Sequence, residues 1–152
     1  MASIASSVTV VTTDGRAGRF GQTVSSFCSV SADPPQMLGC LRSESPICAA
    51  IDVNRCFTIN ILSDNQAPVA NVFAGRAERG ASYDFSTDSW IKDCLGCPVL
   101  PFAPASFSCA LHNRVLSGTH CIYIGRVVSV GRAETSPLIY RARAYGRCLP
   151  LS

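Results

Sequence analysis

Residues 21–41 read GQTVSSFCSVSADPPQMLGCL, and this stretch decides the fold of the chain. In its first half, small hydroxyl residues alternate with apolar ones, which predicts one strand from Phe20 to Ser31 with two different faces. The segment Ala32-Asp33-Pro34-Pro35 ends that strand, and the apolar run over 36–41 predicts a second, buried strand. A strand face made of hydroxyls is better suited to a ligand rich in hydrogen-bond acceptors than to water alone.

The composition is that of a globular protein, because 47% of the 152 residues are hydrophobic and only 15% are charged. We expect a single domain over residues 1–152. No apolar run approaches the roughly 20 residues that cross a bilayer, and the first residues lack the pattern of a signal peptide. The sequence therefore predicts a cytoplasmic protein that does not enter a membrane.

The net charge is +3, and Lys92 is the only lysine among thirteen basic residues. The arginines are scattered and interspersed with acidic residues, whereas a nucleic-acid surface would show a denser basic stripe with aromatic residues in it. We therefore expect no nucleic-acid partner. Arginine also suits the binding of phosphate or carboxylate groups in a fixed geometry.

Nine cysteines lie at positions 28, 40, 48, 56, 94, 97, 109, 121 and 148. Most are inside apolar runs, where cysteine behaves as a small hydrophobic residue. The only C-x-x-C motif is Cys94 to Cys97, with Pro98 directly after it and no second pair of ligands at zinc spacing. We expect no metal site, although a Cys-rich redox or metal-binding protein that uses Cys94 and Cys97 stays open as an alternative.

The rest of the chain reads as short strands joined by loops. Ser45-Pro46 predicts the start of a helix that ends near Ile51, and residues 63–66 fit a capping box before a helix that ends near Phe73. Further strands are predicted over 8–13, 56–62, 106–116, 121–130 and 138–145, and residues 75–104 are predicted to be mostly loop anchored by Trp90. About seven strands without a βαβ rhythm predict a mainly β protein, a closed or split antiparallel β-barrel with two or so short helices.

Several common catalytic motifs are missing from the sequence. No G-x-G-x-x-G follows a predicted strand, and neither a P-loop nor a G-x-S-x-G motif is found. The two histidines, His112 and His120, have no acidic partner at metal spacing. These observations argue against a Rossmann dinucleotide site, a hydrolase and a metalloenzyme.

A set of short motifs is found in a fixed order along the chain. They are SVTVVTT over 7–13, the hydroxyl strand with Pro34-Pro35, FTINIL over 57–62, FAGR over 73–76, GTH over 118–120 with IGRV over 124–127, and PLIY over 137–140 followed by Tyr145. In this order and spacing the chain resembles the short-chain NAD(P)H:flavin oxidoreductases. These are the flavin reductase components of two-component flavin-dependent monooxygenases.

The resemblance implies an FMN-binding split β-barrel with a Greek-key-like antiparallel arrangement, acting as a homodimer. It implies an oxidoreductase that uses NADH or NADPH to reduce FMN or FAD and passes the reduced flavin to a separate monooxygenase component. The cofactor-binding residues it implies are Thr23, Val24, Ser25, Ser26, Ser29, Ser31, Cys40, Leu41, Arg42, Ser45, Asn60, Phe73, Ala74 and Arg76.

The resemblance also assigns residues to the pyridine nucleotide. His120 is implied as the catalytic residue, which orients or charge-stabilises the nicotinamide, since hydride transfer needs no general base. Tyr140, Arg141 and Tyr145 are implied to lie beside it. Thr119 stands where the family usually has an acidic residue, and Arg141 stands where it often has histidine, which could favour a nucleotide with an extra phosphate.

Simpler interpretations stay open for several of these residues. Ser45 could be only a helix cap, Arg76 only a solvated charge, and the two tyrosines only packing residues. For the whole chain, the alternative function is a flavin-binding barrel that does not turn over.

Overall fold

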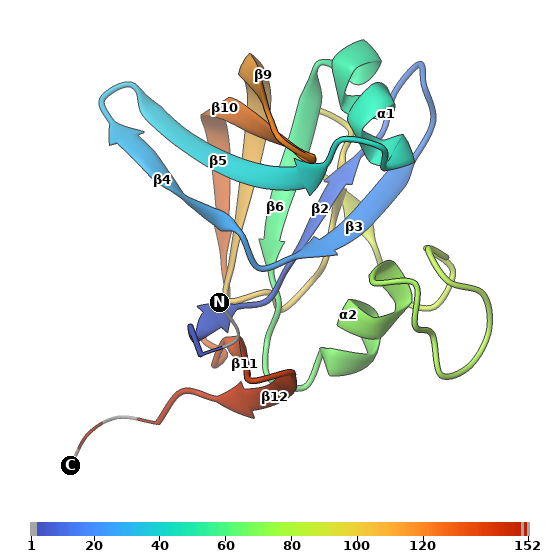
Figure 1. Cartoon of the computed structure of the whole chain (residues 1–152), viewed down its shortest axis with the longest axis vertical. Coiled ribbons are helices and arrows are strands. Elements are labelled where there is room, and N and C mark those ends of the chain that lie inside the picture. The colour runs from blue at the N-terminus through green and yellow to red at the C-terminus, as the bar shows by residue number, and fades with distance from the viewer. Residues whose placement is uncertain (1–2, 150, 152) are drawn as a thin grey trace.

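The computed structural model describes residues 3–149 and 151 of the chain. Its main element is a seven-stranded antiparallel sheet, in the order β3-β2-β6-β9-β10-β5-β4, which curls into a barrel (Figure 1). The strands are β2 (Thr9–Thr13), β3 (Phe20–Val24), β4 (Phe27–Ala32), β5 (Pro35–Arg42), β6 (Cys56–Ile61), β9 (Ala105–Ser117) and β10 (His120–Arg132). The expected mainly β barrel is confirmed.

Two smaller sheets and two helices complete the described fold. One sheet joins β1 (Ser6–Ser7), β11 (Leu138–Arg141) and β12 (Ala144–Arg147), and the other joins β7 (Ile91–Lys92) and β8 (Pro98–Val99). In Figure 1, helix α1 (Pro46–Asn54) lies at one end of the barrel, and helix α2 (Ala67–Phe73) lies near the β11–β12 hairpin at the other end. Neither helix has the length and hydrophobicity that crossing a membrane requires.

The core consists of two apolar clusters, one on each side of β2. All five residues of β2 are buried, because this strand has the barrel interior on one side and the layer under α2 on the other. The barrel cluster contains Val11, Leu41, Phe57, Ile59 and Tyr123 with residues of α1. The second cluster contains residues of β2, α2 and β11 together with residues that flank β2, β6 and β8, namely Val8, Val10, Leu62, Val69, Ala70, Val72, Phe73, Leu100 and Leu138.

The single strand expected from Phe20 to Ser31 is wrong, because the chain forms two strands there. β3 pairs with β2, whereas β4 pairs with β5, so the chain changes partner at Ser25-Ser26. The backbone N–H of Cys40 donates to the carbonyl of Ser26 at 2.9 Å and fixes this crossing. β4 is an edge strand, so the expected alternation of buried and exposed residues is weak in it.

The strand expected over 138–145 is also two strands, joined by the turn Ala142-Arg143. Both turn residues have left-handed φ angles, 51° and 65°, which fits a two-residue hairpin. The usual Asn-Gly signal is missing from the sequence, so the turn was not predictable from turn residues.

The helix predictions are confirmed in outline. α1 begins at Pro46 as expected and continues three residues past Ile51. α2 ends at Phe73 as expected but begins only at Ala67, because the capping box is half formed. The Ser63 N–H donates to Gln66 Oε1 at 2.9 Å, while the Ser63 hydroxyl binds Asn65 instead of the helix.

Trp90 anchors the long segment after α2, as expected. Its ring lies 5.4 Å from the ring of Phe73 and 5.2 Å from that of Phe85, centroid to centroid. β3 runs directly over this aromatic cluster, and a Cβ at Gly21 would lie 2.7 Å from the Phe73 ring. The close approach sets the height of β3 above α2.

Candidate functional site

Three cavities along β3 share lining residues, and we call them together the groove. We call the first the tyrosine cavity, of about 160 Å³, which is lined by Val8, Thr23, Val24, Ser25, Ala74, Arg76, Tyr140 and Tyr145. The second, the histidine cavity, of about 240 Å³, is lined by Gln22, Thr23, Val24, Ser25, Ser26, Cys40, Arg42 and His120. The third, the helix cavity, of about 300 Å³, is lined by Arg19, Phe20, Gly21, Gln22, Ser45, Pro46, Ile47 and Tyr83.

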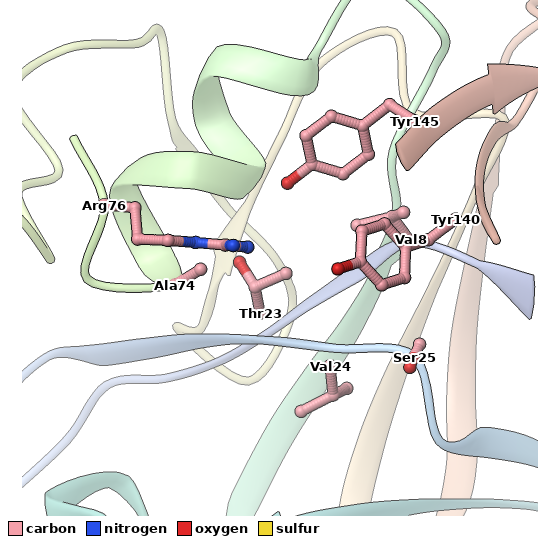
Figure 2. A pocket seen from close by; sticks show the side chains of 8 residues that line it. All are labelled: Val8, Thr23, Val24, Ser25, Ala74, Arg76, Tyr140 and Tyr145. Carbon is pink, nitrogen blue, oxygen red and sulfur yellow. The ribbon is translucent and has the colours of Figure 1, made fainter. Parts of the chain in front are cut away.

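Polar groups from β3, β11, β12 and the turn after α2 line the tyrosine cavity. Figure 2 shows the Arg76 side chain extending toward Thr23, with the hydroxyls of Tyr140 and Tyr145 directed toward the same space. The two tyrosine rings are 5.5 Å apart at an angle of 58°. The Tyr145 hydroxyl lies 2.9 Å from Asn71 Oδ1, to which it donates. Burial raises the pKa of Tyr145, with the Arg76 charge acting in the opposite direction, so the phenol stays protonated at neutral pH.

The turn after α2 places Arg76 at this cavity. Gly75 has a left-handed φ of 73°, and a Cβ there would lie 2.8 Å from the Tyr83 hydroxyl oxygen. The Arg76 N–H then donates back to the Asn71 carbonyl at 2.8 Å. The FAGR motif is therefore a tight helix end that only glycine fits well.

Ser25 and Ser26 lie at the centre of the groove. Both are exposed, since they occupy the crossing between β3 and β4 rather than the interior of a strand. Thr23 differs, because its hydroxyl donates to the Ala70 carbonyl at 2.8 Å. Its oxygen can still accept a hydrogen bond, but its proton is already used.

His120 lies at the end of the histidine cavity, on the first residue of β10. It is exposed and lies opposite Arg42 of β5. Its Nδ1 atom is 3.0 Å from the Thr119 hydroxyl. The Thr119 carbonyl accepts hydrogen bonds from the Ser43 N–H at 3.0 Å and from the Ser43 hydroxyl at 3.1 Å, which fasten the hairpin to the end of β5.

Ser45 and Arg42 form the polar boundary between this region and helix α1. Ser45 has the extended backbone of an N-cap residue, but its hydroxyl makes no capping hydrogen bond. The hydroxyl is therefore available to a ligand at the positive end of the helix.

Five of the residues expected to bind the flavin cofactor lie away from the groove's cavities. Asn60 and Leu41 are buried in the core, and Phe73 belongs to the aromatic cluster. Ser29 and Ser31 lie along β4 beyond the crossing. They do not share one continuous hydroxyl face with Ser25, because the chain changes its pairing partner at Ser25-Ser26.

Arg141 directly follows Tyr140 at the end of β11 and is exposed, outside the tyrosine cavity. Sequence reasoning also missed some cavity residues, among them Val8, Gln22 and Tyr83. Gln22 could have been predicted from the sequence, because it belongs to the alternating strand. No sequence pattern predicts that Tyr83 lines the helix cavity, because a left-handed φ of 62° in the loop places it there.

The groove combines three features that suit a flat, conjugated ligand with a phosphorylated tail. Two exposed serines offer hydroxyls and backbone groups along its middle. Arg76 and two aromatic rings line the tyrosine cavity, His120 and Arg42 line the histidine cavity, and the start of α1 lines the helix cavity. Cations and a helix N-terminus favour phosphate.

A family model described as the flavin reductase like domain matches residues 1–148. The chain therefore belongs to the flavin reductase-like family. It is 38% identical over 146 residues to the FMN reductase (NADH) RutF of Bradyrhizobium diazoefficiens. The aligned region covers 95% of this chain and 80% of that protein.

Solved structures agree with this assignment. The flavin reductase PheA2 in its native state superposes with a TM-score of 0.90 at 29% identity, covering 99% of this chain and 94% of that one. The styrene monooxygenase flavin reductase SMOB from Pseudomonas putida S12 gives 0.85 at 28% identity, covering 99% and 96%.

Proposed function

We propose that this chain, as a single flavin reductase-like domain, uses NADH or NADPH to reduce FMN or FAD and supplies the reduced flavin to a separate monooxygenase. The observation that carries the proposal is the set of cavities that share residues of β3, with polar groups of the expected kinds on both sides. The names of its relatives, an FMN reductase (NADH) and a monooxygenase flavin reductase, support both halves of the reaction.

The groups along the groove fit a flavin. When bound, the flavin accepts hydride from the nicotinamide and carries the two electrons away. Ser25 and Ser26 would hold the ring edge and the ribityl chain, while Arg42 and Ser45 would bind the phosphate. Arg76 lies on the opposite side, where it can neutralise a second anionic group of the flavin or of the nucleotide.

His120 and the two tyrosines would position the nicotinamide. The Thr119 hydroxyl is 3.0 Å from Nδ1 of His120 and restrains the orientation of the imidazole ring. Tyr140 and Tyr145 offer aromatic faces and hydroxyl groups. Arg141, exposed beside them, would favour a nucleotide with an additional phosphate.

We also propose that the chain is a cytoplasmic homodimer that pairs through the outer face of the barrel. Leu38 and Cys40 of β5 lie opposite Ile124 and Ile122 of β10, and Ile122 lies opposite Val115 of β9. The residues between them along β5 and β10 are directed into the barrel, so these five side chains form an apolar outer face. Light scattering should give about twice the chain mass of 16.1 kDa, whereas a monomer would contradict the pairing.

A steady-state assay tests the reductase proposal. NADH and NADPH oxidation is followed with riboflavin, FMN and FAD in turn. We expect oxidation only when flavin is present. Ser25→Ala should raise the KM for flavin about 3- to 10-fold, the effect of losing one hydrogen bond. His120→Ala should mainly lower turnover.

Ser29→Ala is the matched control for Ser25→Ala, because it removes the same hydroxyl from β4 outside the cavities. It should leave both constants unchanged. Flavin binding seen by fluorescence without any NADH or NADPH oxidation would favour the alternative, a flavin-binding barrel without turnover. This alternative is retained because the partner of His120 is the neutral Thr119, whereas the family usually has an acidic residue at this position.

A further inference from the structure

Two buried cysteines from distant parts of the chain face each other outside the groove. The Sγ atoms of Cys56 and Cys97 are 3.4 Å apart, although the residues are 41 positions apart in sequence. Cys97 is completely buried, and Cys56 is 8% exposed. The C-x-x-C motif therefore does not act as a pair of equivalent thiols, since Cys94 is exposed and Cys97 faces β6.

The surrounding hydrogen bonds hold the two sulfur atoms together. Asp93 Oδ1 accepts from the N–H groups of Leu95 and Cys97, at 2.8 and 2.9 Å, and so fixes the turn that carries Cys97. Asp93 Oδ2 accepts from the Thr58 hydroxyl on β6, two residues after Cys56. One carboxylate thus fastens the turn to the strand that carries the other cysteine.

We propose that Cys56 and Cys97 are a peroxide-sensitive dithiol that closes to a disulfide and links β6 to the turn before β8. A peroxide is the oxidant. The sulfur of Cys56 attacks one peroxide oxygen, so that an S–O bond forms and the O–O bond breaks, and the leaving hydroxide takes the Cys56 proton and becomes water. The sulfur of Cys97 then attacks Cys56, the S–S bond forms, the S–O bond breaks, and the Cys97 proton leaves with the second water. Two thiols lose two electrons, and one hydrogen peroxide becomes two waters.

The environment indicates which thiol reacts first. The hydrogen bond from the Cys97 thiol lowers the pKa of Cys56, against burial and the nearby carboxylates of Asp93 and Asp14. The same contact and burial raise the pKa of Cys97. Cys56 also has the greater exposure, so it is the attacking sulfur and Cys97 resolves the intermediate. To bond, the sulfur atoms must approach by about 1.4 Å.

The dithiol has an evident source of oxidant if the proposed function holds, because free reduced flavin reacts with oxygen to give hydrogen peroxide. The test does not depend on that function, since peroxide is added directly. A chain without reductase activity would still form the bond, and an active reductase could still fail to form it.

The experiment maps the bond in the folded protein. After treatment with excess hydrogen peroxide, free thiols are blocked with N-ethylmaleimide under denaturing conditions, and the protein is digested with trypsin. We expect a linked pair of peptides, 56–76 and 93–114, which dithiothreitol separates, with fragment ions that assign the bond to Cys97. The Tm should rise by about 5–10 °C and return on reduction, because the bond restricts the unfolded chain.

Cys94→Ser and Cys97→Ser are the matched variants in the same turn. Cys94→Ser should keep both the linked peptides and the Tm rise, whereas Cys97→Ser should lose both. A bond between Cys94 and Cys97 would overturn the proposal. So would oxidation of the exposed cysteines that leaves Cys56 free to react with the maleimide.

Discussion

Asn60 shows how a residue from a family motif can serve the fold instead of the ligand. Its side chain is completely buried, and Nδ2 donates to the Val10 carbonyl at 3.1 Å and to the Thr12 hydroxyl at 3.2 Å. Its Oδ1 accepts from the Leu100 N–H at 3.0 Å. The amide therefore joins β2, β6 and the segment after β8, and no group is left for a flavin.

We predict that Asn60→Ala lowers the free energy of unfolding by about 2–4 kcal/mol, because it leaves the buried Leu100 N–H without its acceptor and opens a cavity. The KM for FMN of the folded variant should stay within about twofold of the original. Urea unfolding and the flavin assay measure the two quantities. Unchanged stability with a strongly raised KM would show instead that Asn60 contacts the ligand.

At the scale of single residues, the sequence predicts exposed polar groups better than buried ones. Ser25, Ser26, Arg42 and His120, all of which the resemblance assigns to ligands, line one cavity. Asn60 is also polar, but it is buried where β6 pairs with β2, with Val10 directly opposite it. The hydrogen bond between the two residues joins positions 50 residues apart, and local sequence patterns do not contain such a contact.

Among the elements, the β11–β12 hairpin matters most for the site, because it presents Tyr140 and Tyr145 directly opposite each other. Its turn residues Ala142 and Arg143 both have left-handed φ angles, although neither residue type favours them. The hairpin is thus formed by packing of its strands rather than by turn preference.

We predict that replacing the turn by Asn-Gly, in the double variant Ala142→Asn with Arg143→Gly, raises the free energy of unfolding by about 1 kcal/mol, since these residues prefer the observed angles. Chemical denaturation measures the change. Arg143→Ala is the control, because it removes the same charge but keeps a Cβ in the left-handed conformation, and it should give no gain. A less stable double variant would mean that the left-handed φ angles of the turn do not limit the free energy of unfolding.

The elements were predictable wherever local patterns determine them. Pro46 placed the start of α1 and Phe73 the end of α2, since the signals for both lie within a few residues. The breaks at Ser25-Ser26 and Ala142-Arg143 were missed, because an extended chain that changes its partner keeps its β-type alternation. With residues 20–31 read as one strand, Ser29 and Ser31 extend the face of Ser25, whereas in the structure they lie on β4, beyond the change of partner.

At the scale of the whole molecule, the number and spacing of the strands predicted the barrel. They did not predict which residues of the long segment after α2 contact it. Tyr83 reaches the helix cavity, and Cys56 meets Cys97, only because the long segment after α2 folds back on the barrel. The cysteine motif alone pointed to Cys94. Contacts of this kind depend on how the barrel closes, and the sequence of one chain contains no direct signal for them.

The Cys109 thiol and the Tyr123 phenol are buried in the barrel, and they make the folded protein less stable at high pH. Burial raises the pKa of Cys109 from its usual 9.0 to about 12, with the Asp93 charge acting in the same direction. Burial also raises the pKa of Tyr123, whose hydroxyl donates to the Cys48 carbonyl. Both groups therefore stay protonated in the folded state at a pH where they ionise in the unfolded chain.

We predict that stability is constant with respect to these groups below pH 9 and falls as the pH rises from 9 toward 12. The unfolded chain binds fewer protons than the folded one in that window, so each raised group costs up to about 1.4 kcal/mol of unfolding free energy per pH unit. Urea unfolding between pH 8 and about 11 measures the slope. Cys109→Ala lowers stability at every pH because it leaves a cavity, but its slope above pH 9 should be shallower than that of the original protein. Equal slopes would show that the Cys109 thiol ionises in the folded barrel as readily as in the unfolded chain, and burial would then not protect it.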